Sequence, residues 1–253
     1  MTSNRIRIPR VAMGCSTRHK GPNVKGADGI LGLGQGSISF PSQIGHLYGD
    51  KFSYCFPSHG NSTSSTSTYL VFSDRSLDHL KSDLGYTPFL KNPPGAPDTF
   101  YYIGIEGIKI NGKRLPIPRS IWLVDRLGSG GSIVDFGTTL TYLLQPSYGI
   151  LLAAFERLVI YPRISLDPFD LCFNSFGLEN LRLPEFSIEF AGSASFRPPV
   201  DNYFIHAAPK IRCLGIVSVP PLFGVNLIGN MMHQNFFIEF DRRNSRFGFA
   251  RTN

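Results

Sequence analysis

The chain of 253 residues contains 26 glycines and 19 prolines, with only 17% charged and 13% aromatic residues. Helical bundles need more Glu, Lys and Arg than this, so the composition favours an all-β protein with a large apolar core and excludes a disordered chain. The 25 basic and 18 acidic residues give a net charge of +7, but no nucleic-acid-binding motif accompanies them, so we expect no nucleic-acid partner. No apolar run reaches membrane-spanning or signal-peptide length, so we expect no membrane partner and find no signal peptide in this chain.

The first part of the chain has the pattern of short strands, glycine-rich turns and one short helix. Alternation of apolar and polar residues predicts strands at residues 6–13 and 51–56, and Pro41 suits the first turn of a helix. The glycines of residues 27–34 lack the spacing of a dinucleotide-binding loop, so they predict a tight crossing of two backbones. Asn61 opens a possible glycosylation sequon within a Ser/Thr-rich loop.

Prolines surround a glycine in residues 93–97, which is the strongest linker pattern in the chain. We therefore predict two domains, residues 1–95 and residues 96–253. The second domain is expected to open as a β-meander, because residues 100–111 alternate and end at an Asn-Gly hairpin turn. Helical spacing of apolar residues behind a proline predicts a helix at residues 146–160. Further strands are predicted at residues 186–190, 203–205, 212–217 and 236–240.

One acidic residue stands in an unusual setting. Asp135 follows a short apolar strand and enters a turn made of Phe136, Gly137, Thr138 and Thr139. Glycine lets the backbone turn sharply beneath the carboxylate, and threonine hydroxyls can donate hydrogen bonds that stabilise its ionised form. The segment therefore fits a catalytic acid, and it fits an ordinary hairpin equally well.

Two segments of two apolar residues and a glycine flank the predicted linker, Ile30-Leu31-Gly32 before it and Leu227-Ile228-Gly229 after it. Other phrases in the chain are Phe52-Ser53-Tyr54-Cys55, Phe100-Tyr101-Tyr102-Ile103, Phe169-Asp170-Leu171-Cys172-Phe173 and Ile228-Gly229-Asn230. With the Asp135 segment, and in this order, they resemble pepsin-like aspartic proteases, above all the plant nepenthesin-like branch. The resemblance extends from about residue 8 to residue 250, nearly the whole chain.

The resemblance implies an all-β, bilobal pepsin-like fold, with an incomplete N-terminal lobe in residues 1–95 and a complete C-terminal lobe in residues 96–253. Each lobe of such a protease contributes one aspartate, and the peptide substrate lies in the cleft between them. Asp135 matches the second catalytic aspartate. The residues expected to support its loop are Gly137, Thr138 and Thr139.

The resemblance also implies a peptide or protein substrate, a monomer, no cofactor and no metal, and a secreted, extracellular or vacuolar location. Judged from the residues alone, four widely spaced cysteines fit either disulfides or buried thiols. The resemblance pairs Cys172 with Cys213 and leaves the pairing of Cys15 and Cys55 open. The sequon at Asn61 fits the same oxidising compartment.

Two departures from the family pattern bear on activity. No Asp-Thr-Gly or Asp-Ser-Gly precedes Ile30, so the first catalytic loop and the flap would lie upstream of Met1, and Phe136 stands where the family has Ser or Thr. A solitary aspartate lacks the second carboxylate with which to share a proton. We therefore expect an aspartic endopeptidase by family whose chain has little or no activity alone. The alternative is a non-catalytic binding or inhibitor protein that resembles plant xylanase inhibitors.

Overall fold

The computed structural model describes residues 5–18, 27–57, 68–73, 84–125, 128–178, 181–219 and 224–252. These residues form strands β1 to β18 and two α-helices, so the expected all-β class is confirmed. The helices are α1 (Phe40–Tyr48) and α2 (Ser147–Leu158). The strands are β1 (Lys51–Cys55), β2 (Tyr69–Phe72), β3 (Gly85–Leu90), β4 (Tyr101–Ile103), β5 (Ile105–Ile110), β6 (Lys113–Arg114), β7 (Ser132–Val134), β8 (Thr141–Leu143), β9 (Arg163–Leu166), β10 (Phe169–Asn174), β11 (Phe186–Phe190), β12 (Ser195–Phe196), β13 (Phe204–Ala208), β14 (Ile211–Leu214), β15 (Ile216–Ser218), β16 (Asn226–Ile228), β17 (Phe236–Asp241) and β18 (Arg246–Arg251).

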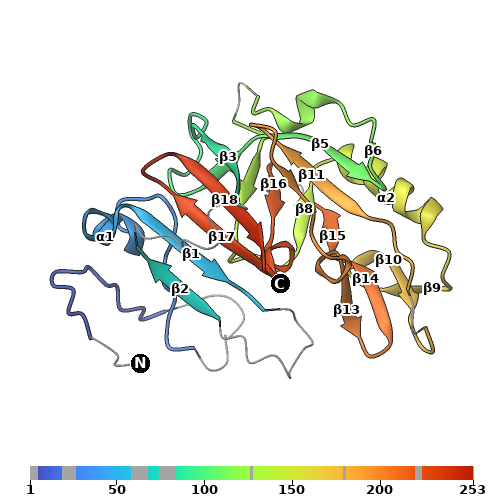
Figure 1. Cartoon of the computed structure of the whole chain (residues 1–253), viewed down its shortest axis with the longest axis horizontal. Helices are drawn as coiled ribbons and strands as arrows, with labels where there is room; N and C mark the ends of the chain where they lie inside the picture. Colours follow the sequence, from blue (N-terminus) through green and yellow to red (C-terminus); the bar gives the residue numbers. More distant parts are fainter. Residues whose placement is uncertain are drawn as a thin grey trace.

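A sheet of ten strands runs through the molecule in the order β15-β8-β16-β7-β4-β3-β18-β17-β1-β2. The hairpin β17–β18 near the end of the chain pairs with β1 on one side and with β3 on the other (Figure 1). The predicted linker at residues 93–97 joins β3 to β4, which are neighbours in this sheet. The sheet thus crosses the predicted boundary, and the division into 1–95 and 96–253 stays a prediction.

Two four-stranded sheets complete the part that follows β4, with the orders β13-β14-β10-β9 and β12-β11-β5-β6. The first carries the disulfide between Cys172 and Cys213, which face each other across β10 and β14. Helix α2 begins directly after Pro146, as predicted, and buries Leu151 and Phe155 against this core. No helix in the described part of the chain is long and apolar enough to cross a bilayer.

Helix α1 is also where the sequence places it. The Ser39 side chain accepts a hydrogen bond from the Ser42 backbone nitrogen, Pro41 lies in the first turn, and Gly49 ends the helix with a φ of 73°. A side-chain oxygen at the first cap and a left-handed glycine at the last one are the common way to satisfy free backbone groups at helix ends.

The strand predicted at residues 6–13 is absent. The segment is irregular, and its apolar side chains are exposed, with 71% of Ile6 and 89% of Met13 accessible to solvent. Within the described residues no strand pairs with it, and an extended segment without a ladder partner gains no sheet hydrogen bonds. Its alternation was therefore insufficient to form a strand.

The predicted crossing of backbones at residues 27–34 is confirmed only at its end. A Cβ added to Gly34 would lie 2.8 Å from the carbonyl oxygen of Thr99, so only glycine fits there. A Cβ added to Gly29 or Gly32 would meet no atom within 4 Å. Likewise, the strand predicted at 212–217 is divided between two sheets, because the chain leaves β14 and enters β15 at Gly215.

A charged network around the buried Asp241 links the neighbouring strands β1, β17 and β18 of the large sheet. The Asp241 side chain is fully buried, with Lys51 Nζ at 3.3 Å and Arg246 Nε at 2.9 Å from its Oδ2. Burial acts to raise the pKa of Asp241, but hydrogen bonds from Asn244 and Arg246 and the charge of Lys51 outweigh it and hold the pKa below its usual value. The carboxylate therefore stays ionised and joins strands from both ends of the chain.

We expect Asp241→Asn to lower the free energy of unfolding by about 2 kcal/mol, because it removes the carboxylate that pairs with Arg246 and leaves the buried Lys51 with Glu239, at 3.5 Å, in place of two carboxylates. Urea unfolding at neutral pH measures the change. Asp98→Asn, at an exposed carboxylate, is the matched control and should leave stability within about 0.5 kcal/mol of the parent. Equal stabilities for the two variants would contradict a structural role for the network.

Candidate active site

Asp135 lies at the end of β7, in the turn that the sequence singled out. Its side chain is half-buried and each carboxylate oxygen has its own donor. Thr138 Oγ1 donates to Oδ2 at 2.6 Å, and the Gly137 backbone nitrogen donates to Oδ1 at 2.8 Å. A Cβ on Gly137 would lie 3.1 Å from Oδ1, so glycine is the residue that best allows this close approach. The turn therefore holds the carboxylate in one orientation.

A second segment from far along the chain crosses beneath this turn. Strand β16 pairs in parallel with β7, with Ile228 beside Val134, and the Asp135 backbone nitrogen donates to the Ile228 carbonyl oxygen at 3.0 Å. The next residues continue the contact, because Asn230 donates through its backbone nitrogen to Thr138 and through its side-chain amide to the Phe136 carbonyl. The Asp135 turn is thus fixed from both of its sides.

Gly229 makes this crossing possible. A Cβ at this position would lie 2.7 Å from the Thr139 carbonyl oxygen and closer still to the Leu140 carbonyl oxygen. Real Cβ atoms do not approach backbone oxygens this closely, and Gly229 has a φ of −85°, which any residue can adopt. The requirement for glycine is therefore steric, and it follows from how near the two backbones pass.

The sequence-related segment in the first part of the chain makes no such crossing. Ile30 is 95% exposed and Leu31 is 52% exposed, whereas Leu227 and Ile228 are buried. No heavy atom of the described chain lies within 4 Å of a Cβ placed on Gly32. The two similar phrases therefore have different surroundings, and only the later one supports an aspartate turn here.

The Phe136 side chain packs in an aromatic cluster beside the aspartate turn. Its ring centroid lies 5.2 Å from that of Tyr54, 5.8 Å from that of Phe240 and 6.4 Å from that of Phe52. Tyr54 and Phe52 belong to β1, and Phe240 belongs to β17. The Phe136 side chain therefore packs against a strand that precedes residue 95 and against a strand near the end of the chain. A threonine or serine there would lose this packing.

Tyr54 and His233 form a buried pair beside the same turn. The Tyr54 hydroxyl lies 2.8 Å from His233 Nδ1, and both side chains are almost fully buried. Burial raises the pKa of Tyr54 well above its usual value, and the negative charge of Asp135 raises it further. Burial lowers the pKa of His233 from 6.5 to about 3. Both groups are therefore neutral in mildly acidic and neutral solution.

The sequence also singled out Thr139, two further cysteines and Asn61. Thr139 is exposed and contributes its carbonyl oxygen, which accepts from the Met231 backbone nitrogen at 3.1 Å. Cys55 is buried as a free thiol and Cys15 is exposed as another, so neither forms a disulfide in the structure. The sequon at Asn61 lies outside the described residues. Among the described residues, no group of three or more His, Cys, Asp or Glu side chains is arranged to hold a metal ion.

Sequence reasoning missed the pair of Tyr54 and His233. Tyr54 stands in a phrase that indicates only the family resemblance, and no motif of the sequence analysis contains His233. No spacing signal connects them, because 179 positions of sequence separate the two residues. The Ile228-Gly229-Asn230 phrase, in contrast, did signal the residues that cross the turn.

Comparison with known proteins defines the family. A family model described as "Xylanase inhibitor C-terminal" matches residues 100–251, and one described as "Xylanase inhibitor N-terminal" matches residues 1–74. The chain belongs to this family of pepsin-like aspartic proteases. Its bilobal all-β fold is confirmed by the crystal structure of edgp, which has a TM-score of 0.75 and 26% identity over 91% of this chain and 61% of that one.

Curated relatives carry protease names. "Aspartyl protease family protein 2" of Arabidopsis thaliana is 36% identical over 256 residues, which cover 99% of this chain and 50% of the relative. "Aspartic proteinase nepenthesin-1" of Nepenthes gracilis is 32% identical over 254 residues, which cover 99% of this chain and 55% of the relative. The chain therefore spans about half the length of the curated relatives that it matches.

Gly32 occupies the matching position in the similar phrase Ile30-Leu31-Gly32, so it provides the control for a test of the crossing at Gly229. We expect Gly229→Ala to lower the free energy of unfolding by about 2 kcal/mol or more, because the added methyl group meets backbone carbonyls that cannot move freely. Gly32→Ala, in open space, should change it by less than about 0.5 kcal/mol. Thermal and urea unfolding measure both, and similar losses in the two variants would contradict the steric argument.

Burial of His233 in its neutral form predicts a loss of stability in acid. Its pKa is lowered to about 3 in the folded chain, so between about pH 6.5 and pH 3 only the unfolded chain binds the proton, and stability falls as pH falls. We expect His233 to lower the free energy of unfolding by about 2.5 kcal/mol as the pH falls from about 7 to about 4.5. Urea unfolding at both pH values measures it for the parent and for His233→Gln.

The His233→Gln variant should lose this part of the pH dependence of stability, since glutamine does not titrate. His206→Gln, at an exposed histidine, is the matched control and should keep the pH dependence of the parent. If the free energy of unfolding of His233→Gln changed between the two pH values as much as that of the parent, His233 would be protonated in the folded chain at the lower pH.

Proposed function

We propose that this chain supplies one half of an aspartic endopeptidase site, with Asp135 as one of the two carboxylates that activate water. The observation that carries the proposal is the fixed carboxylate itself, held by Thr138 Oγ1 and the Gly137 nitrogen in a turn that Ile228 and Asn230 brace from below. A chance hairpin needs neither two donors on its carboxylate nor a crossing strand. The protease names of the relatives point in the same direction.

The chemistry needs a second carboxylate within hydrogen-bond reach of the same water. Two such groups cannot both ionise at close range, so they share one proton, and one acts as a base toward water while the other acts as an acid toward the peptide. This sequence contains one Asp-x-Gly-Thr turn, at Asp135. We therefore propose that the polypeptide alone hydrolyses peptides slowly or not at all.

The substrate proposed is a peptide or unfolded protein, and the chain is proposed to be monomeric. A secreted or vacuolar location is proposed, because the disulfide of Cys172 and Cys213 requires an oxidising compartment to form. The proposed mechanism uses carboxylates and water.

A second candidate is a protein that binds others without catalysis. The observation that favours it is Phe136, whose ring fills the aromatic cluster with Tyr54 and Phe240 at the place where active relatives are expected to carry a hydroxyl. The matching family models also bear the description of xylanase inhibitors. In this alternative the aspartate turn persists as a structural element.

A fusion experiment separates the two candidates. The part of "Aspartyl protease family protein 2" that precedes its match to this chain would be joined to the front of the chain, and a denatured protein would be offered at about pH 3 to 5. We expect cleavage by the fusion that pepstatin inhibits, and a loss of at least about 1000-fold in Asp135→Asn because the water loses one of its two carboxylates. The unfused chain should show little or no cleavage.

Asp98→Asn in the same fusion is the matched control and should retain full activity, because Asp98 is exposed and lies outside the turn. A fusion that folds cooperatively but does not cleave would contradict the protease proposal and favour the binding protein. Pepstatin-sensitive cleavage by the unfused chain would contradict the requirement for a second carboxylate on another segment.

A further inference from the structure

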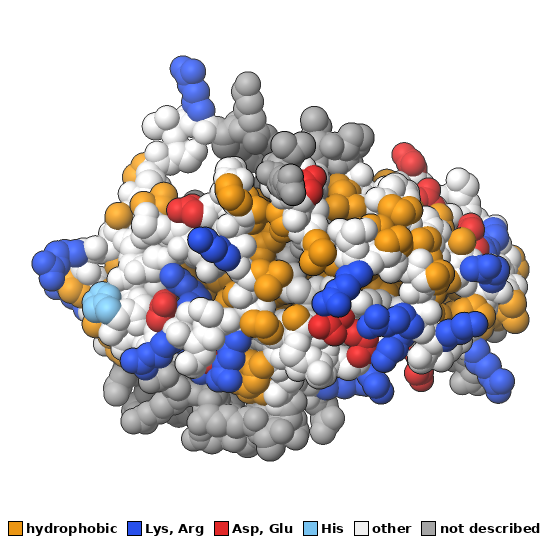
Figure 2. All heavy atoms as spheres, turned by 90° about the horizontal axis from the view of Figure 1, so that it is seen from above, with side chains coloured by type: hydrophobic (Ala, Val, Ile, Leu, Met, Phe, Trp, Pro, Cys, Tyr) orange, Lys and Arg blue, Asp and Glu red, His pale blue; other side chains and the backbone are white. Residues whose placement is uncertain are grey.

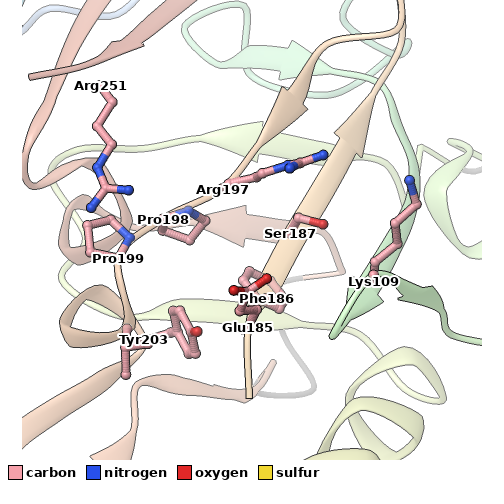
Figure 3. A pocket seen from close by; sticks show the side chains of 11 residues that line it. Lys109, Glu185, Phe186, Ser187, Arg197, Pro198, Pro199, Tyr203 and Arg251 are labelled. Atoms are coloured by element: carbon pink, nitrogen blue, oxygen red, sulfur yellow. The ribbon is translucent and has the colours of Figure 1, made fainter. Parts of the chain in front are cut away.

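A cavity of about 530 Å³ lies away from the Asp135 turn, on the side of the molecule formed by β5, β11 and the end of β18. Its cationic walls come from Lys109 on β5, Arg197 after β12, and Arg251, the last residue of β18. Lys109 and Arg251 stand on opposite sides of the cavity, with Arg197 and Ser187 between them (Figure 3). Among the lining residues, three cations face one carboxylate, that of Glu185.

Two of these cations are available to a ligand. Neither Arg197 nor Arg251 forms an ion pair within the described part of the chain, and Arg197 donates only through Nε, to Ser195 Oγ at 3.3 Å. The terminal nitrogens of both guanidinium groups therefore donate to no acceptor among the described residues. A planar guanidinium with free donors binds phosphate, sulfate or carboxylate groups with two hydrogen bonds.

The third cation is held in place by a network. Lys109 Nζ lies 3.2 Å from Glu189 Oε1, which also accepts a hydrogen bond from Ser195 Oγ at 2.9 Å. Burial acts to raise the pKa of Glu189, but these hydrogen bonds and the nearby positive charges outweigh it and keep the pKa below its usual value. The ionised Glu189 thereby positions both Lys109 and, through Ser195, the side chain of Arg197.

A buried hydroxyl completes the polar wall. Ser187 is only 8% exposed and lies directly opposite Lys109 in the pairing of β11 with β5. Its hydroxyl makes no hydrogen bond with the described residues although it lines the cavity. Because the hydroxyl lines the cavity, a ligand oxygen there can form a hydrogen bond with it in place of water.

Apart from Glu185, the rest of the lining is apolar. Pro198, Pro199 and the ring of Tyr203 form one wall (Figure 3), and the Tyr203 hydroxyl is already bonded to the Pro184 carbonyl at 2.8 Å. Two consecutive prolines restrict the backbone that carries Arg197, so the site loses little conformational entropy when it binds a ligand. The volume matches a ligand the size of one or two sugar rings.

We propose that this cavity binds a small organic anion that carries several phosphate, sulfate or carboxylate groups on a sugar-sized framework. Arg197 and Arg251 bind the anionic groups, Lys109 adds charge, and the Ser187 hydroxyl donates to an oxygen of the same ligand. The framework lies against the two prolines and Tyr203. The site is separate from the Asp135 turn, so the proposal does not depend on peptide hydrolysis.

One face of the molecule shows both signs of charge side by side. On the face shown in Figure 2, lysine and arginine side chains are spread along the molecule with acidic side chains among them. A general attraction of anions to a chain of net charge +7 would therefore involve many positions. The proposed site differs because losing one of two specific arginines should remove most of the binding.

Isothermal titration calorimetry of the full chain tests the site with three probes, myo-inositol hexakisphosphate, sucrose octasulfate and citrate, which distinguish phosphate, sulfate and carboxylate. Uncharged myo-inositol and sucrose are the framework controls. We expect at least one anionic probe to bind with a stoichiometry of one, and its affinity to fall as salt is raised from about 50 mM to about 300 mM. The uncharged controls should not bind.

Variants assign the binding to this cavity. We expect Arg197→Gln and Arg251→Gln each to weaken binding by about fivefold or more, and Ser187→Ala by about threefold without any change of charge. Lys91→Gln, at an exposed lysine that lines no described cavity, is the matched control and should change affinity by less than about twofold. Equal effects of Arg251→Gln and Lys91→Gln, or no binding of any anionic probe, would overturn the proposal.

Discussion

The close passage of Gly229 beneath the aspartate turn is the constraint on which the rest of this site depends. Because the backbone of residues 228–230 lies directly against that of residues 138–140, the turn cannot shift without moving β16, and β16 is anchored by its parallel pairing with β7. The carboxylate of Asp135 inherits this rigidity through two short hydrogen bonds. A water-activating group needs such a fixed orientation, since misplacement by even about 1 Å costs much of the rate.

The chain end provides the frame around the site. The hairpin β17–β18 inserts between β1 and β3, and its buried side chains Phe240 and Asp241 serve two different purposes on opposite faces of the strand. Phe240 stacks on Phe52 with ring centroids 4.7 Å apart, while Asp241 holds Lys51 in a buried ion pair. One face is apolar and one is ionic, so segments almost 190 positions apart are joined in a single register. The early residues are thereby attached to a core formed mainly by later ones.

The fold separates two kinds of polar site. The aspartate turn presents a single carboxylate whose neighbours, Tyr54 and His233, are neutral because they are buried. The cavity between β5, β11 and the end of β18 presents cations instead, fixed by the ionised Glu189. In each place hydrogen bonds or an ion pair with neighbouring residues position the polar group: Thr138 and Gly137 hold Asp135, and Glu189 holds Lys109. The two sites share no residue, so each can be altered without the other.

The sequence by itself determined the features that depend on neighbours along the chain. The alternation of β5, the Asn-Gly turn behind it, both helices and the turn that carries Asp135 follow from local propensity, from prolines that suit helix starts and from glycines that allow sharp turns. Tertiary structure decided the rest. Residues 6–13 alternate but have no strand to pair with in the described chain, residues 212–217 divide between two sheets, and Phe136 packs among rings from β1 and β17. These outcomes depend on which distant backbones meet, and no local pattern of residues encodes that choice.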